Sequence, residues 1–157
     1  MRTTIKEMVQ AIADAVAACV PGAEHYMGRL EEPISRPAFL YVPTYFGEKK
    51  ANYFTSTRNV EIQIIYFGRT DGSGNEDFME RLDTEAKLEA FLVQQFIPVG
   101  DRYLHFNYEV KEADKQMAIY LTFQFLDEAL DQAFIDREKA ELAGSIKVEM
   151  VGKAKAD

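Results

Sequence analysis

The sequence is poor in the residues that usually bind metals or react with substrates. Among its 157 residues it has one cysteine, two histidines and no tryptophan. Cys19 has no partner for a disulfide within the chain, and we interpret it as a small buried hydrophobe. His25 and His105 lie far apart, with no further Cys or His beside them. We therefore expect no metal site.

Long hydrophobic runs and excess positive charge are also missing. No apolar run approaches the roughly 20 residues that cross a bilayer, and the N-terminus lacks a signal-peptide pattern. We expect a protein made in the cytoplasm that does not bind membranes. The 18 basic and 26 acidic residues give a formal net charge of −8, which opposes binding by phosphate neutralisation. DNA could still slide past an acidic wall without specific binding.

Catalytic motifs are absent as well. The sequence contains no GxSxG, GxxxxGK[ST], HExxH or CxxC pattern. Glu109, Glu112 and Asp114 lie at a link between two expected strands, where acidic residues favour a solvated turn. The glycine-containing loop 68–75 has no lysine and carries Asp71, so it would repel phosphate. We predict no catalytic residue, no cofactor and no enzymatic activity.

The first half of the chain predicts one helix and a long hairpin. Apolar residues at helical spacing indicate a helix over 4–18, with Thr4 and Glu7 as a capping box. A short strand is expected at 25–28. Residues 37–46 and 53–67 are rich in β-favouring residues and predict two strands joined by a turn at 47–52. Pro43 indicates an edge position or a bulge.

The second half predicts another helix and a second hairpin. After the polar loop we expect a helix over 76–96, with Ser73 or Asn75 as its cap. The helical wheel places six residues on one apolar side of this helix: Phe78, Met79, Leu82, Ala86, Val93 and Phe96. Strict alternation of apolar and polar residues over 103–110 and 116–126 predicts two antiparallel strands.

These elements together predict an α+β fold, in which a small, mostly antiparallel sheet is packed by two helices. The expected order is α-β-β-β-α-β-β, followed by a C-terminal extension. We place one domain at residues 1–126. Residues 127–157 are charged, and we expect an extension that is partly helical or that adds a strand to a sheet.

Aromatic residues are concentrated around the first hairpin, more densely than one small sheet needs. They could fill the core of the domain, or some could contact a neighbouring subunit, since aromatic residues are enriched in interface cores. We keep both interpretations. The candidate contacts to other subunits or to a partner are Tyr45, Phe46, Lys49, Lys50, Tyr53, Phe54, Arg58, Phe91, Phe134, Ile146 and Val148.

Three segments resemble a known family. They are the N-terminal helix TIKEMVQAIADAV, the segment LEEPISRPAFLYV at 30–42, and the strand RNVEIQIIYFG at 58–68, which leads through a polar loop into a helix. A final strand QMAIYLTFQF at 116–125 completes the pattern. Over roughly residues 1–126 the chain resembles the tail terminator (tail completion) proteins of long-tailed bacteriophages. The tail after 126 is longer and more charged than in that family.

This resemblance implies a structural virion protein at the head-proximal end of the tail. It implies a homo-oligomeric ring, a hexamer, that caps the tail tube, ends tube polymerisation and joins the tail to head-completion proteins. The major tail tube protein and the connector would be partners, and DNA would pass through an acidic lumen.

Other functions fit the same sequence. Another ring or adaptor protein of the head–tail junction could use a similar α+β domain. A small ligand-binding or enzymatic domain would require a pocket between the second helix and the sheet, around Glu85 and Glu89. A cytoplasmic tail-assembly chaperone would be missing from finished particles.

Overall fold

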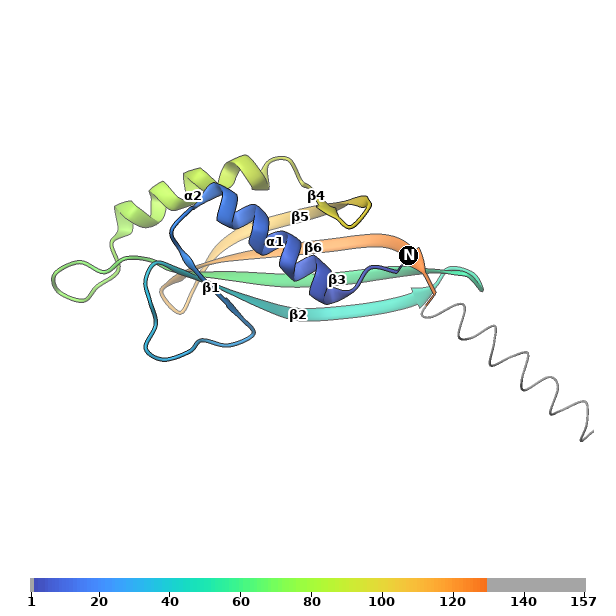
Figure 1. Cartoon of the computed structure of the whole chain (residues 1–157), viewed down its shortest axis with the longest axis horizontal. Helices are drawn as coiled ribbons and strands as arrows, with labels where there is room; N and C mark the ends of the chain where they lie inside the picture. Colours follow the sequence, from blue (N-terminus) through green and yellow to red (C-terminus); the bar gives the residue numbers. More distant parts are fainter. Residues whose placement is uncertain (1, 130–157) are drawn as a thin grey trace, which may run out of the picture.

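A computed structural model describes residues 2–129, which form two helices on one face of a six-stranded, mostly antiparallel sheet (Figure 1). The elements, in chain order, are α1 (Ile5–Cys19), β1 (Glu24–Met27), β2 (Ala38–Lys50), β3 (Thr55–Phe67), α2 (Phe78–Leu92), β4 (Phe96–Val99), β5 (Arg102–Ala113) and β6 (Gln116–Glu128). The predicted α+β class is confirmed. The order differs from the prediction by one additional strand, β4.

The strands lie in the order β1-β2-β3-β6-β5-β4. β1 pairs with β2 in parallel, and the remaining neighbours are antiparallel. The four central strands are long, whereas the two edge strands have four residues each. As a result, β1 and β4 cover only part of the strands beside them.

α1 follows the sequence prediction closely. The Thr4 side chain accepts a hydrogen bond from the Glu7 amide, and the Glu7 carboxylate accepts one from the Thr4 amide, so the capping box is present. Met8, Ile12 and Val16 are fully buried against the sheet. The apolar stripe of this helix therefore forms one side of the core, as its spacing predicts.

The first hairpin is longer and tighter than expected. β2 continues to Lys50, so the turn comprises residues 51–54 in place of 47–52. The register shifts between Pro43 and Tyr45, which is the bulge that Pro43 indicated. Pro43 also lies beyond the part of β2 that β1 covers. Both expectations for this proline are confirmed.

α2 is shorter than predicted at both ends. Its N-cap is Asp77, whose side chain accepts from the Glu80 amide at 3.2 Å, and neither Ser73 nor Asn75 has that role. The helix ends at Leu92 because Gln95 adopts a left-handed φ of 55°, and Pro98 could not continue a helix. Residues 96–99 instead form β4, which the sequence analysis missed.

The predicted apolar side of α2 does not face the core. Its buried residues are Thr84, Leu88, Phe91 and Leu92, whereas the residues predicted for that side are all exposed. The end of the domain also shifts slightly, because β6 runs two residues past the expected boundary at 126. Most of the predicted extension, 130–157, lies outside the described residues.

Candidate interaction surfaces

The β2–β3 hairpin exposes four aromatic side chains, two in β2 and two in the turn. Tyr45, Phe46, Tyr53 and Phe54 are all exposed, and Phe46 exposes 70% of its surface. The rings of Tyr53 and Phe54 meet edge to face, with their centroids 4.8 Å apart. Lys50 lies over the Tyr53 ring, with its Nζ 5.3 Å from the centroid. We call these four aromatic residues the hairpin patch.

The turn that carries Tyr53 and Phe54 is held by the Asn52 side chain and by backbone hydrogen bonds from the Ala51 and Asn52 amides to the Thr55 carbonyl. Asn52 Oδ1 accepts hydrogen bonds from the amides of Phe54 and Thr55, at 2.8 and 3.0 Å, and from the Thr55 hydroxyl at 2.8 Å. Such an Asx turn fixes the backbone locally. A partner that binds here meets an ordered tip, so less entropy is lost on binding.

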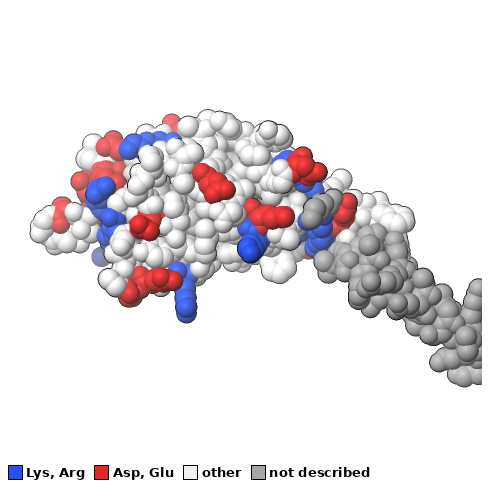
Figure 2. All heavy atoms as spheres, viewed as in Figure 1, with Lys and Arg blue, Asp and Glu red and all other residues white. Residues whose placement is uncertain are grey.

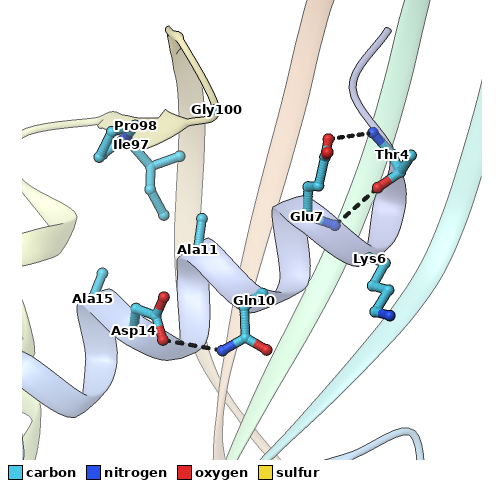
Figure 3. A pocket seen from close by; sticks show the side chains of 10 residues that line it. All are labelled: Thr4, Lys6, Glu7, Gln10, Ala11, Asp14, Ala15, Ile97, Pro98 and Gly100. Atoms are coloured by element: carbon cyan, nitrogen blue, oxygen red, sulfur yellow. Dashed lines mark hydrogen bonds between the residues drawn. The ribbon is translucent and has the colours of Figure 1, made fainter.

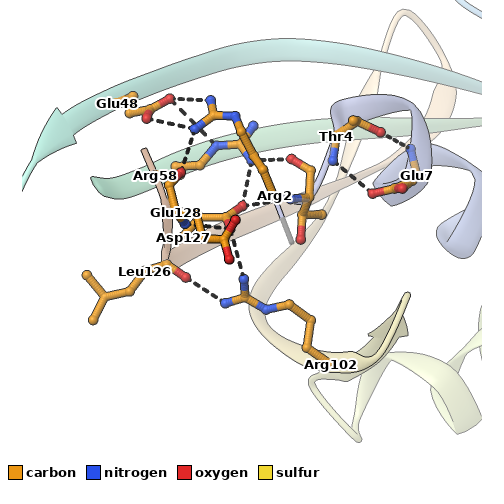
Figure 4. A network of polar contacts seen from close by, with 10 residues as sticks. Arg2, Thr4, Glu7, Glu48, Arg58, Arg102, Leu126, Asp127 and Glu128 are labelled. Atoms are coloured by element: carbon orange, nitrogen blue, oxygen red, sulfur yellow. Dashed lines mark hydrogen bonds and ion pairs between the residues drawn. The ribbon is translucent and has the colours of Figure 1, made fainter. Parts of the chain in front are cut away.

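Behind the patch, a buried ionic network joins the N-terminus, β3 and the end of β6 (Figure 4). Arg58, only 5% exposed, donates to the Thr3 carbonyl and to Asp127 Oδ2, the latter at 3.0 Å. Arg102 donates to Asp127 Oδ1 at 3.2 Å and to the Leu126 carbonyl at 2.6 Å. Arg58 therefore stabilises the interior of this end of the molecule.

The acidic members of the network are ionised more readily than ordinary carboxylic acids. Burial raises the pKa of Asp127, but hydrogen bonds from the amides of Thr3 and Glu128 and from Arg58 outweigh it, so the pKa lies below its usual value. The Arg2 guanidinium, 2.6 Å from Glu48, is the main cause that lowers the pKa of Glu48 to about 2. Both groups carry charge at neutral pH.

The predicted interface residues divide into three groups. Six are exposed on the β2–β3 hairpin: Tyr45, Phe46, Lys49, Lys50, Tyr53 and Phe54. Arg58 and Phe91 are buried; the Phe91 ring packs 5.2 Å from that of Phe106, so neither side chain is free on the surface of the chain. Phe134, Ile146 and Val148 lie outside the described residues.

A second apolar surface covers the side of α2 that faces away from the core. Met79, Leu82, Ala86, Ala90 and Val93 are exposed and follow one another at intervals of three or four residues, which aligns them on one side of the helix. Met79 is 65% exposed. We call these five residues the α2 stripe. The sequence analysis identified most of them as the apolar side of the predicted helix.

Two grooves flank α1. One, of about 760 Å³, lies between α1 and β4 and is lined by Ala11, Ala15, Ile97 and Pro98 among others (Figure 3). Four of its polar side chains are already engaged: Thr4 and Glu7 cap the helix, and Gln10 donates to Asp14 at 3.0 Å. The other, of about 330 Å³, lies between α1 and the β2 edge. The lining of these grooves suits the binding of apolar side chains better than it suits catalysis.

No arrangement for catalysis or metal binding occurs in residues 2–129. No cluster of three or more His, Cys, Asp and Glu side chains could hold a metal there. His25 shares a hydrogen bond of 2.8 Å with the Tyr41 hydroxyl, and burial lowers its pKa. Glu85 and Glu89 do not line the hollows described here. None of the helices described here is long and apolar enough to span a membrane.

Charge is distributed without a dominant sign on the face shown in Figure 2, where acidic and basic side chains alternate.

A family profile described as phage tail terminator protein matches residues 7–134 of this chain. The chain belongs to the phage tail terminator family. A comparison with curated proteins gave no match.

Membership of the tail terminator family establishes the general role. The protein is a structural, non-enzymatic component of the phage tail and hence of the virion, and the family implies association with the tail tube. The resemblance that the sequence analysis inferred for residues 1–126 is confirmed, with a match over residues 7–134.

Proposed function

We propose that this terminator forms a ring that caps the completed tail tube at its head-proximal end. The cap would stop the tube protein from adding further subunits and would present its opposite face to the head-completion proteins. DNA would pass through the lumen without specific binding, consistent with a net charge of −8.

The hairpin patch is the observation that carries this proposal. Two of its four exposed aromatic residues, Tyr53 and Phe54, lie on the ordered turn between β2 and β3, and Tyr45 and Phe46 lie within β2. This turn extends beyond the helices that cover the sheet (Figure 1). Aromatic anchors of this kind are typical of binding hot spots. We infer that the patch docks on the last ring of tube protein and covers the surface that the next ring would need.

The experiment mixes purified tail tubes with the protein and measures tube length and end density by electron microscopy. The wild type should place a ring of density at one end and stop growth when tube protein is added. The double variant Phe46→Ser/Phe54→Ser should remain folded and leave the tubes growing. Tyr103→Ser is the matched control, since Tyr103 is an exposed aromatic residue of β5, outside the patch.

Full capping by the hairpin variant would exclude the patch as the tube contact. Density on the head side of particles, with tube ends left open, would favour a junction adaptor over a terminator. The part of the chain after 127, with Phe134, Ile146 and Val148, remains a proposed second contact. Deleting 130–157 tests it without removing Asp127 or Glu128, and unchanged capping and mass would count against it.

A further inference from the structure

Two strand edges on opposite sides of the sheet are only half covered. β1 pairs with residues 38–41 of β2, and β4 pairs with residues 102–105 of β5. Gln95 also bonds to Phe106, through its carbonyl and its side chain. Within residues 2–129, no strand pairs with the outer edges of 42–50 in β2 or 107–113 in β5. Such open backbone edges are templates for another strand.

The directions of these strands are compatible with pairing between copies. β2, β3, β6 and β5 alternate in direction, so β2 and β5 are antiparallel to each other within one chain. A rotation about a ring axis preserves the direction of each strand along that axis. Placing β2 of one copy beside β5 of the next therefore extends the antiparallel alternation across the boundary.

One pair of opposite charges, Lys49 and Glu109, lies on the same face of the two edges, and Glu109 Oε2 also lies 3.1 Å from Lys111 Nζ on its own strand. Lys49 is aligned with Thr57 of β3, and Glu109 with Tyr120 of β6; these positions belong to the face of the sheet that the helices do not cover. Both side chains are exposed. Cross-strand pairs of opposite charge favour pairing.

Apolar surfaces accompany each edge. α2 lies along the β5 margin of the molecule and β2 along the opposite margin (Figure 1). The α2 stripe is exposed at the first margin, and the groove of about 330 Å³ lined by Ile5, Val9, Met27 and Pro43 opens at the second. Adjacent copies joined through the sheet would bring this ridge and this groove together, burying both.

We propose that neighbouring copies of this chain pair β2 with β5, with Lys49 opposite Glu109, so that one sheet continues around the ring. The contact uses two different surfaces, and a contact of this kind generates a ring when the rotation between copies closes. In one chain Glu109 is in line with Tyr120, Gln63 and Val42, so the proposed register staggers successive copies along the strands. A stagger of this kind tilts the strands, as closed sheets require. The inference rests on the proposed ring.

The test uses the double variant Lys49→Cys/Glu109→Cys in full-length protein with Cys19→Ser. Lys49 lies seven residues beyond Val42, so the two cysteines of one chain are about 20 Å apart or more, and only a bond between copies can form. After mild oxidation, a non-reducing gel should show a ladder that ends at one fixed copy number. The control Lys49→Cys/Lys87→Cys, with a cysteine on the exposed side of α2, should give little product.

The mass of the unoxidised protein is measured by light scattering up to high concentration, to separate the two proposals. A ladder specific to the 49/109 pair supports edge pairing. A ring-sized mass with no such ladder overturns edge pairing and leaves the ring intact. A monomer at every concentration with no ladder counts against both.

As an independent check, Met79→Ser/Leu82→Ser should weaken association at least tenfold with little loss of stability, and unchanged association would remove the α2 stripe from the contact.

Discussion

Removing the charge of Asp127 should destabilise the fold more than any surface substitution. Its carboxylate is 3% exposed and accepts from Thr3, Arg58, Arg102 and Glu128. Removing one partner of a buried ion pair costs about 3–5 kcal/mol, because the other charge stays buried. We expect Asp127→Asn at the lower end, about 3 kcal/mol, since Arg58 keeps the Thr3 carbonyl as an acceptor.

The measurement is urea unfolding followed by circular dichroism, repeated between pH 7 and pH 2.5. A loss of about 3 kcal/mol corresponds to a fall in Tm of roughly 10 °C for a domain of this size. The folded-state pKa of Asp127 lies below its unfolded value, so its contribution is fully present above about pH 4 and is lost as the pH falls toward the folded pKa. The difference between wild type and variant should therefore shrink in acid.

Asp83→Asn serves as the control, because Asp83 is exposed on α2. It should change the free energy of unfolding by less than about 0.5 kcal/mol at every pH. If Asp127→Asn costs less than about 1 kcal/mol, or if its cost stays constant down to pH 2.5, the network does not stabilise this end of the molecule as argued.

Three further predictions concern individual side chains, and each is measured by chemical denaturation. Asp77→Ala should cost about 1 kcal/mol through loss of the α2 cap. Leu88→Ala should cost about 2–5 kcal/mol because Leu88 is fully buried, whereas Leu82→Ala should cost under about 0.5 kcal/mol. Glu48→Gln should cost about 0.5 kcal/mol, since its pair with Arg2 is partly exposed, and that difference should vanish only as the pH falls toward 2.

Local signals in the sequence predicted the fold well. The capping box at Thr4 and Glu7, the bulge at Pro43 and the alternation along β5 and β6 all act between residues that are near in sequence or in one strand. β4 was missed because four residues cannot show a periodicity. The general role was predicted from a family resemblance. The buried residues of the core gave no information about that role.

The ionic network could not be predicted, because its partners are distant along the chain. Arg58 and Asp127 are 69 residues apart, and Thr3 and Asp127 are 124 apart. A lone arginine in a strand is usually exposed, so Arg58 was assigned to an interface. Its burial depends on the N-terminus and the end of β6 meeting beside it, which no local pattern encodes.

The α2 helix shows what periodicity leaves undetermined. Its spacing identifies an apolar side, but spacing does not say which partner covers that side. The core is covered by Leu88, Phe91 and Leu92, and the stripe that includes Met79 and Leu82 faces away. A helix that is apolar on two sides leaves one apolar side in contact with water, which is unfavourable until a partner covers that side. In a protein that belongs to a tail, the simplest cover is a second copy, and the half-covered strand edges beside the helix indicate where that copy would lie.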